Sequence, residues 1–335
     1  MMSSRKVSVI GSGAWGSTLA QILCDAGSEV LIWGRNAQVI EEINTQHTNN
    51  RFLQNITLPT KLKGTTDIQE AFAFGEFIVL AIPAQTLREN LLRWTDIFPR
   101  DKTIISTLKG IEAHTHLRMT EVVTEVLGIP ASQMGLITGP NLADELSLRQ
   151  PAGAVAASPH PTISSEMIEL FTTPYFRVYP SDDLVGCELI GAAKSVIGIA
   201  VGMALGLGLG ENTQAMIITR GLSEVARFGE AYGANPLTLL SLAGVGDLVA
   251  SASSPLSRNR TFGELLGKTG SIEKALASGK KTVEGVASAE PLTELAHRVG
   301  IEVPIMEVVS DVVNHGMTPA DAINKLMTIS VAAEL

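Results

Sequence analysis

The feature that most constrains the fold of this chain is a glycine-rich turn, GSGAWG, at residues 11–16. It follows an apolar run typical of a buried strand (VSVI) and precedes a stretch that predicts a helix over Trp15–Ala26. In such a turn Gly11 permits the tight bend, and Gly13 lets a pyrophosphate approach the backbone. Gly16 allows close packing of helix on strand, with phosphate at the helix N-terminus. Because a second strand (EVLIW) follows in register, the pattern predicts dinucleotide binding.

Short apolar strands alternate with amphipathic helices over about the first 180 residues. The predicted strands are Lys6–Ile10, Glu29–Trp33, Phe77–Ile82, Thr103–Thr107, Gly135–Thr138, Gly153–Ala157 and Phe176–Tyr179. Helical patterns between them include Trp15–Ala26, Gln85–Trp94 and Leu117–Leu127. This alternation predicts an α/β fold, a Rossmann-type doubly wound sheet that is mostly parallel.

After about residue 183 the strand-like runs stop and helical patterns follow one another. The expected helices are Leu184–Leu205, Asn212–Tyr232, Pro236–Leu242, Phe262–Leu266, Ile272–Ala277, Ser288–Val299, Ile305–His315 and Pro319–Ile329. Pro236, Pro291 and Pro319 are placed near helix starts, where a missing N–H costs little. With 335 residues, the chain is long enough for about two domains. We expect a dinucleotide-binding Rossmann-type domain over residues 1–185 and an all-helical substrate and catalytic domain over residues 186–335.

Charge and cysteine content exclude several classes of function. The formal net charge is −9 and no run of basic residues occurs, so nucleic-acid binding is disfavoured. Cys24 and Cys187 lie in different segments, which suits a reducing compartment, and the N-terminus lacks the pattern of a signal peptide. The uncharged run Ser195–Gly210 is shorter than the ~20 residues that span a bilayer and contains five glycines. His114 and His116 have no further ligand at metal-binding spacing. We expect a cytoplasmic protein with a buried helix, no membrane span and no metal site.

The residues after the second strand bear on the choice of dinucleotide. An NAD enzyme usually places Asp or Glu there to bind the ribose hydroxyls, whereas this chain has Arg35 and Asn36. Arg35 can pair with a 2′-phosphate through charge-assisted hydrogen bonds, and Asn36 can bind the ribose of either cofactor. An exposed arginine without such a role is the alternative. The pattern favours NADPH over NADH.

Two lysines occupy positions that favour chemistry. Lys194 lies in the apolar stretch LIGAAKSVIGIAVG, where desolvation lowers the pKa of a lysine toward the working pH. Such a group can exchange a proton with a hydroxyl or carbonyl oxygen; a structural lysine at a helix end is the alternative. Lys109 ends the run IISTLKG, and ligands collect beyond the carboxyl ends of strands in open α/β sheets.

Two loops offer further donors for an anionic substrate. Gly139 and Pro140 follow a strand and precede a helix start at or near Asn141, where backbone N–H groups can hold an oxygen or phosphate. A simple turn is the alternative there. The segment SRN at residues 257–259 offers a fork of donors for phosphate, although a solvated surface loop explains it equally well. Asp247, beside glycines and apolar residues, is expected to orient or balance a lysine.

Ten segments occur in an order that is typical of one enzyme family: GSGAWG, LIWGR, IVLAIP, STLKGIE, ITGPNLADEL, GAAKSVIGIAVGM, ENTQAMIITRGL, LAGVGDL, SRNR and KTVEGV. Together they resemble the NAD(P)-dependent glycerol-3-phosphate dehydrogenases over essentially the whole chain. The resemblance implies a Rossmann-type domain with a helical domain, often as a homodimer. It also implies reversible reduction of a small phosphorylated substrate, dihydroxyacetone phosphate, to sn-glycerol 3-phosphate for glycerophospholipid synthesis.

The resemblance implies roles for individual residues, and the family's proton-transfer lysine matches Lys194. The expected substrate contacts are Lys109, Gly139, Asn141, Lys194, Asp247, Ser257, Arg258 and Asn259. The expected cofactor contacts, for NADP(H) or NAD(H), are Gly11, Gly13, Ala14, Trp15, Gly16, Arg35, Lys109, Ala143, Arg258, Val283 and Glu284.

The chain departs from the family's pattern at three positions. Ala14 stands where Ser is common, so only a backbone contact carries over. Asn141 replaces a Ser or Thr hydroxyl, although its amide can still donate a hydrogen bond, and Ser195 replaces the usual Asn. The alternative functions are another two-domain hydroxyacid dehydrogenase, whose substrate carries a carboxylate, and a non-catalytic dinucleotide sensor, which has no need for a buried lysine.

Overall fold

The structure, a computed structural model, describes residues 4–277 and 283–328 and divides into two compact units. The first unit comprises Met1–Lys109 and Leu117–Glu188, and the second comprises Gly110–His116 and Leu189–Leu335. The sequence places the boundary between residues 185 and 186. The contacts instead divide the chain after Glu188, inside a helix, and group the short segment after Lys109 with the second unit.

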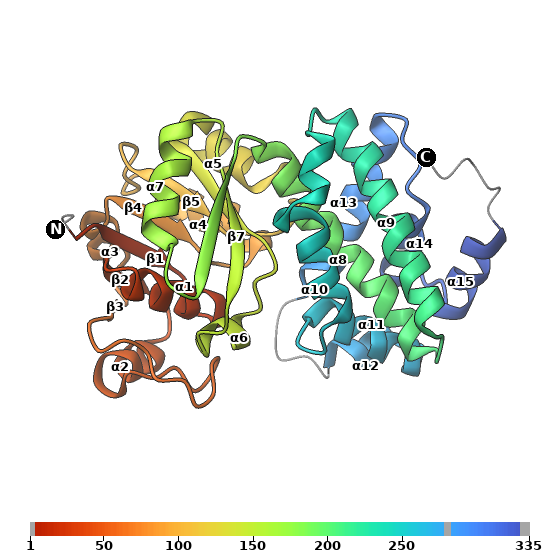
Figure 1. Cartoon of the computed structure of the whole chain (residues 1–335), viewed down its shortest axis with the longest axis horizontal. Coiled ribbons are helices and arrows are strands. Elements are labelled where there is room, and N and C mark those ends of the chain that lie inside the picture. The colour runs from red at the N-terminus through yellow and green to blue at the C-terminus, as the bar shows by residue number, and fades with distance from the viewer. Residues whose placement is uncertain (1–3, 278–282, 329–335) are drawn as a thin grey trace. The chain divides into compact units, whose positions relative to one another are not determined.

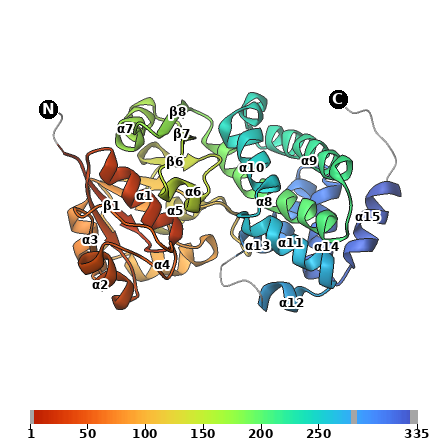
Figure 2. The same ribbon diagram turned by 60° about the horizontal axis from the view of Figure 1, so that its bottom comes forward.

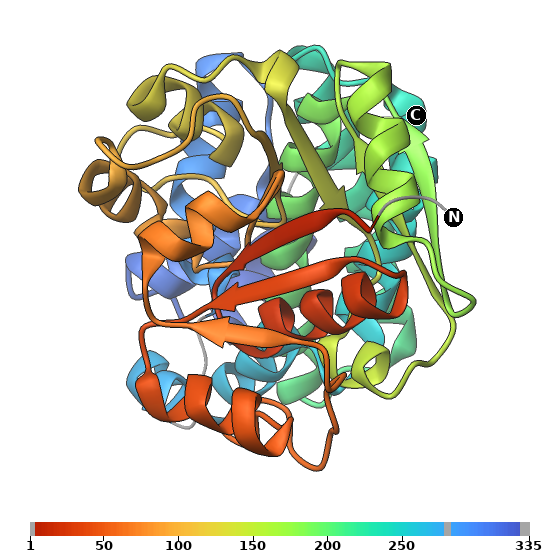
Figure 3. The same ribbon diagram turned by 90° about the vertical axis from the view of Figure 1, so that its left-hand side faces the viewer.

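An eight-stranded sheet forms the centre of the first unit, in the order β3-β2-β1-β4-β5-β6-β7-β8 (Figure 1). The strands are β1 (Lys6–Ile10), β2 (Glu29–Trp33), β3 (Lys63–Thr65), β4 (Phe77–Leu80), β5 (Thr103–Ser106), β6 (Met134–Thr138), β7 (Ala152–Ala157) and β8 (Phe176–Ser181). Neighbouring strands are parallel except β6 and β7. Figure 3 shows β1, β2 and β3 side by side, in red to orange. The predicted doubly wound sheet is confirmed, and its strand order reverses beside β1, where such sheets bind ligands.

Helices cover both faces of this sheet. They are α1 (Ala14–Asp25), α2 (Ala37–Gln46), α3 (Ile68–Phe74), α4 (Leu87–Trp94), α5 (Met119–Leu127), α6 (Ala143–Ser147) and α7 (Pro161–Phe171). Successive side chains of a strand point to opposite faces, and in β4 Val79 joins one buried cluster while Ile78 and Leu80 join the other. Residues of α1, α2 and α7 belong to the first cluster, and those of α3, α4 and α5 to the second. Burial on both faces explains why these strands are continuous apolar runs.

The described residues from Leu189 onward form helices and the segments that connect them, and contribute no strand to the sheet (Figure 2). The helices are α8 (Leu184–Gly206), α9 (Glu211–Ala231), η3 (Pro236–Leu240), η4 (Leu242–Gly246), α10 (Asp247–Ser253), α11 (Arg258–Thr269), α12 (Ile272–Ala277), α13 (Glu284–Arg298), α14 (Pro304–Asn314) and α15 (Pro319–Thr328). The all-helical expectation is confirmed; Ile329, the predicted end of the last helix, lies outside the described residues. The placement of Pro291 at a helix start is wrong. It lies inside α13, where burial of Ala289 and Leu292 beside it offsets the backbone hydrogen bond that proline removes.

Glycines on one face of α8 explain its long uncharged run. Gly198, Gly202 and Gly206 recur every four residues and therefore share a face. A Cβ atom on Gly202 would lie 2.1 Å from the backbone oxygen of Arg260, and one on Gly263 would lie 2.2 Å from that of Ile199. The backbones of α8 and α11 thus approach too closely for side chains. Although α8 is long and apolar enough to cross a membrane, 89% of its apolar window is buried inside the protein.

A buried carboxylate joins α9 to α14. Oε1 and Oε2 of Glu224 accept hydrogen bonds from the backbone N–H groups of Ile305 and Met306, at 2.8 and 3.3 Å. Burial raises the pKa of Glu224 to about 7, although these backbone donors oppose the shift. The folded protein therefore holds this proton more tightly than the unfolded chain does.

Replacement of Glu224 by Gln is expected to change how stability depends on pH. The wild type should lose stability as the pH rises from about 4.5 through about 7, since the raised pKa belongs to the folded state. The neutral amide does not titrate, so between pH 5 and pH 8 the wild type should lose about 1–3 kcal/mol more stability than the variant does. The variant should be less stable than the wild type at pH 5, because Gln has one acceptor oxygen for the two backbone N–H groups that donate to Glu224. Urea unfolding at both pH values measures the two changes, and equal changes in wild type and variant would contradict the assignment.

Candidate active site

The glycine-rich turn between β1 and α1 has the geometry that a pyrophosphate requires. Gly11 has a φ of +127°, and a Cβ atom there would lie 2.4 Å from the backbone oxygen of Ala81. A Cβ on Gly16 would lie 1.8 Å from the backbone oxygen of Gly11, so helix and turn pack directly on each other. A Cβ on Gly13, by contrast, would meet no atom within 4 Å. The turn is therefore closed on the protein side and open at Gly13.

The N-terminus of α1 gives the glycine-rich turn a partial positive charge. Gly13 is its N-cap, and no side chain of the described residues caps this end. The first backbone N–H groups of a helix point outward and carry a partial positive charge, which attracts phosphate. Ala14 and Trp15 supply these groups, so the departure at Ala14 leaves the backbone N–H groups of this helix end in place. This cradle fits the pyrophosphate of a dinucleotide.

Arg35 lies beside the turn because β2 ends there. The backbone N–H of Gly11 donates to the carbonyl of Trp33 at 2.9 Å, and a Cβ on Gly34 would lie 2.0 Å from Oγ of Ser12. Arg35 follows directly and is exposed. The side-chain oxygen of Asn36 caps α2 by accepting from the backbone of Gln38 and Val39, at 3.0 and 3.2 Å. That oxygen therefore serves the helix, in addition to any ribose contact of the amide.

A second group of predicted residues lies beyond β5 and β6. Nζ of the half-buried Lys109 donates to the carbonyl of Gly139 at 3.1 Å, and Gly139 has a φ of +143° that favours glycine. Helix α6 begins at Ala143, slightly later than the expected start near Asn141, because Leu142 is its N-cap. The hydroxyl of Thr18 on α1 contacts the carbonyl of Ala143 at 3.4 Å, which places Ala143 beside the dinucleotide-binding helix.

Asn141 offers a ligand a different side-chain atom from the one that the sequence suggested. Its Nδ2 donates to the carbonyl of Gly153 at 3.1 Å, so the amide donor serves the chain itself. Its Oδ1 is buried and has no hydrogen-bond partner within the described part of the chain. The atom left for a ligand is therefore an acceptor, whereas the sequence suggested a donor.

The predicted lysine of the second unit lies in a buried polar cluster. Lys194 is 7% exposed and Asp247 is 2% exposed, and Nζ of Lys194 lies 2.6 Å from Oδ1 of Asp247. Nζ also lies 2.7 Å from Oγ of Ser251. Two side-chain oxygens, one of a carboxylate and one of a hydroxyl, therefore hold Nζ of Lys194 in place. The expectation that Asp247 balances a lysine agrees with this geometry.

The backbone before α10 explains how Asp247 reaches the lysine. Gly244 has non-helical angles (φ −97°, ψ −108°), and a Cβ there would lie 2.1 Å from the backbone oxygen of Leu239. After this kink α10 begins at Asp247, and Ser251 follows one turn later on the same face. From the sequence, no helix was predicted over Asp247–Ser253 and Ser251 was not singled out. The spacing of four between the two polar residues was the available signal.

The predicted phosphate loop forms the start of α11. Ser257 is the N-cap and Arg258, which is exposed, is the first helical residue. Oδ1 of Asn259 accepts from the backbone N–H of Gly285 at 3.1 Å. A Cβ on Gly198 would lie 3.5 Å from Cβ of Asn259, so Asn259 packs on α8 one turn after Lys194.

The last predicted cofactor contacts begin α13. Val283 is its N-cap and Glu284 its first residue, while Lys281 and Thr282 of the KTVEGV motif lie outside the described residues. A Cβ on Gly285 would lie 2.6 Å from the backbone oxygen of Ser195, which brings the start of α13 against α8. The predicted residues of the second unit thus gather around the middle of α8.

The other candidate groups, a histidine and two cysteines, lie in surroundings that indicate structural roles. The ring of His116 contacts Arg298 and Glu294, and no group of three potential metal ligands occurs among the described residues. Burial raises the pKa of the Cys24 and Cys187 thiols to about 12, so neither is a thiolate at neutral pH.

Comparisons with known proteins agree with the two-part arrangement. Residues 6–164 match the family model of the NAD-dependent glycerol-3-phosphate dehydrogenase N-terminus, and residues 183–324 match that of its C-terminus. A glycerol-3-phosphate dehydrogenase (NAD(P)+) of Streptomyces griseus is 47% identical over 329 residues, with 98% of each chain covered. One of Thermobifida fusca is 47% identical over 330 residues, again with 98% of each covered. The crystal structure of glycerol-3-phosphate dehydrogenase from Coxiella burnetii has a TM-score of 0.91 at 32% identity, covering 97% of this chain and 99% of that one.

Proposed function

The chain belongs to the NAD-dependent glycerol-3-phosphate dehydrogenase family, and on that premise we propose that it reduces dihydroxyacetone phosphate to sn-glycerol 3-phosphate, reversibly, with NADPH or NADH. The observation that carries the proposal is the buried Nζ of Lys194, held by Asp247 and Ser251. An alcohol dehydrogenase must protonate the oxygen of its carbonyl substrate, and an ammonium fixed by two neighbours can do so without first reorganising.

The roles are assigned to each domain by itself. Residues 1–185 are assigned mainly to the dinucleotide, with Lys109 as a substrate contact. Residues 186–335 are assigned to substrate and proton transfer, with Arg258, Val283 and Glu284 as further cofactor contacts. When bound, the nicotinamide supplies the hydride that reaches C2 of the substrate. Lys194 gives the C2 oxygen its proton and is reprotonated from solvent, while Asp247 holds its ammonium in place. Lys109, oriented by the Gly139 carbonyl, neutralises the anionic substrate.

Phosphate recognition is assigned to the start of α11. Arg258 presents a guanidinium at an exposed helix N-terminus, where charge and dipole both favour an anion. The side-chain oxygen of Asn259 is used by Gly285, so its Nδ2 is the group that can face phosphate.

Replacement of Arg258 by Ala is expected to raise the KM for dihydroxyacetone phosphate by about ten- to a hundredfold, since a charge-assisted hydrogen bond contributes about 1.5–3 kcal/mol. kcat should fall as well, because phosphate binding positions the reacting carbon. Activity on unphosphorylated dihydroxyacetone is the control and should change much less. Equal losses on both substrates would mean that Arg258 does not recognise the phosphate.

Cofactor preference is assigned to Arg35. A charge-assisted contact with the 2′-phosphate should favour NADPH over NADH by about tenfold or more, reduced by the solvent exposure of this arginine. Arg35→Asp should reverse the order, because its carboxylate repels the phosphate and accepts from the ribose hydroxyls. The measurement is kcat/KM with both cofactors at fixed ionic strength. A ratio that the substitution leaves unchanged would remove Arg35 from cofactor selection.

A substrate panel tests the proposed activity against its rivals. Cofactor oxidation should require dihydroxyacetone phosphate and should be negligible with 2-keto acids of similar size. Preference for a keto acid would favour a hydroxyacid dehydrogenase, and cofactor binding without turnover on any carbonyl would favour a sensor.

The cellular setting is part of the same proposal. The product is the backbone of glycerophospholipids, which supports a role in their synthesis, and the reduced buried cysteines support a cytoplasmic location. Exposed apolar side chains at η3, with Leu237 69% and Leu240 75% exposed, support a homodimer. Sedimentation of the wild type and of Leu240→Glu measures the oligomeric state.

A further inference from the structure

The segment that follows α2 sends one buried side chain to the glycine-rich turn. Asn49 is fully buried, and its Nδ2 donates to the carbonyl of Ser12 at 3.0 Å and to Oγ of Ser17 at 2.8 Å. Ser12 lies between Gly11 and Gly13 of the turn, and Ser17 lies in the first turn and a half of α1. One amide thus contacts the dinucleotide-binding turn at Ser12 and the helix that follows it at Ser17.

The orientation of this amide follows from its partner. A backbone carbonyl can only accept, so the atom of Asn49 that faces Ser12 must be the donor Nδ2. Oδ1 of Asn49 is buried and has no hydrogen-bond partner within the described ranges. A buried oxygen without a donor is unfavourable for folding. We therefore expect Asn49 to act through its donor Nδ2, which holds the Ser12 carbonyl and the Ser17 hydroxyl.

Fixing the Ser12 carbonyl also fixes the next N–H group. In a planar trans peptide the C=O of Ser12 and the N–H of Gly13 point in opposite directions. With the carbonyl turned toward Asn49, the Gly13 N–H points away from it. The Cβ position of Gly13 meets no atom within 4 Å, so Gly13 lies where the protein leaves room for a ligand.

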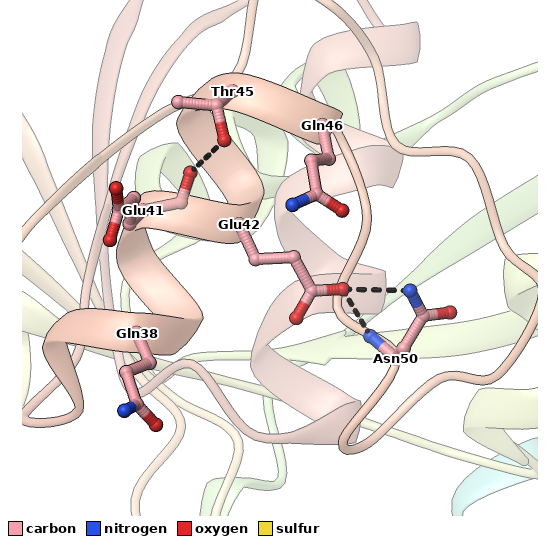
Figure 4. A pocket seen from close by; sticks show the side chains of 6 residues that line it. All are labelled: Gln38, Glu41, Glu42, Thr45, Gln46 and Asn50. Atoms are coloured by element: carbon pink, nitrogen blue, oxygen red, sulfur yellow. Dashed lines mark hydrogen bonds between the residues drawn. The ribbon is translucent and has the colours of Figure 1, made fainter.

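The residues on either side of Asn49 are held to α2. Oε1 of Glu42 accepts from Oγ1 of Thr48 at 2.7 Å and from the backbone N and Nδ2 of Asn50 at 2.8 and 2.9 Å. Figure 4 shows the two contacts between Glu42 and Asn50 in a shallow polar pocket on α2. These donors lower the pKa of Glu42, so the carboxylate remains ionised at neutral pH. The segment 48–50 is thus anchored to α2 by its outer residues and to the turn by Asn49.

We propose that Asn49 is a positioning residue for the dinucleotide: it holds the Ser12–Gly13 peptide so that its N–H group faces the pyrophosphate. The inference rests on the proposed function, because it requires that the turn bind NAD(P)H. Since both cofactors contain the same pyrophosphate, loss of Asn49 weakens both equally. This separates its role from that of Arg35, which acts on the 2′-phosphate.

The test compares Asn49→Ala with the matched control Asn44→Ala. Asn44 is an exposed residue of α2 whose Nδ2 also donates to a backbone carbonyl, that of Gly64, away from the turn. Dissociation constants for NADH and NADPH are measured by quenching of protein fluorescence or by calorimetry. Asn49→Ala should raise both by about tenfold with their ratio unchanged, while kcat at saturating cofactor stays within about threefold. Asn44→Ala should leave both constants within about twofold.

A measurement without cofactor supports the same test. In the protein alone, hydrogen exchange of the Ser17 amide, whose N–H donates to the carbonyl of Gly13 at 2.9 Å, should be faster in Asn49→Ala than in the wild type and in Asn44→Ala. Glu42→Ala, which leaves the buried core untouched, serves if Asn49→Ala does not fold; it should raise both dissociation constants by about threefold. Wild-type affinity in the Asn49 variant, or a change confined to one cofactor, would overturn the inference. Failure of the wild type to bind either cofactor would instead overturn the proposed function.

Discussion

Replacement of Lys194 by Met is expected to lower kcat by about 10²–10⁴-fold, the range that general acid catalysis contributes. Met keeps an apolar stem of similar length inside α8 but has no proton to give. Lys194 is not among the expected cofactor contacts, so the dissociation constant of the cofactor should barely change. Steady-state rates with dihydroxyacetone phosphate, together with cofactor titration, measure the two effects separately.

A matched control is available in the same unit. Lys268 is an exposed lysine of α11 that pairs with Glu264, so Lys268→Met removes a lysine without touching the buried cluster. Its kcat should equal that of the wild type. Turnover by Lys194→Met within about tenfold of the wild type would remove Lys194 from the proton-transfer step.

Replacement of Asp247 by Ala is expected to destabilise the protein by about 3–5 kcal/mol, because the buried ammonium of Lys194 then loses its counter-charge. The same change should also lower kcat, since Ser251 alone holds the ammonium less firmly than both partners do. Urea unfolding of the wild type and variant measures the loss.

A double-mutant cycle assigns this loss to the ion pair. In the Lys194→Met background no ammonium is buried, so Asp247→Ala should destabilise less than it does in the wild type, by about 0.5–3 kcal/mol. Equal costs in both backgrounds would mean that Asp247 stabilises α10 by another route and that the pair is not coupled.

The parts of the fold that the sequence predicts well are those whose signal is local. Strands β1 and β2 have the predicted bounds, because turn residues flank short runs of β-branched residues. Strand β3 was not predicted, because its three residues at the sheet edge, Lys63–Thr65, are too few to show a strand pattern. Pro291 was wrongly placed at a helix start, because its burial inside α13 depends on tertiary packing that no local pattern reports.

The candidate site divides in the same way. Lys194 stands out in the sequence as a charge among apolar residues, and its partner Asp247 was within reach of that reasoning. Ser251 was missed because α10, which begins only after the kink at Gly244, was not predicted, although its spacing of four from Asp247 was an available signal. The donor of Asn141 is used by Gly153, twelve residues away, and Asn49 reaches Ser12 across 37 residues. Contacts at such separations are set by strand order, which a single sequence does not display.

The central claim, hydride transfer to dihydroxyacetone phosphate, is tested most directly by following the hydride. The purified protein is incubated with dihydroxyacetone phosphate and NADPH that carries deuterium at both C4 positions of the nicotinamide, and the product is analysed by mass spectrometry and NMR. The account predicts one sn-glycerol 3-phosphate for each NADPH oxidised, with a single deuterium at C2. Unlabelled product, or no substrate-dependent oxidation of NADPH or NADH, would contradict it.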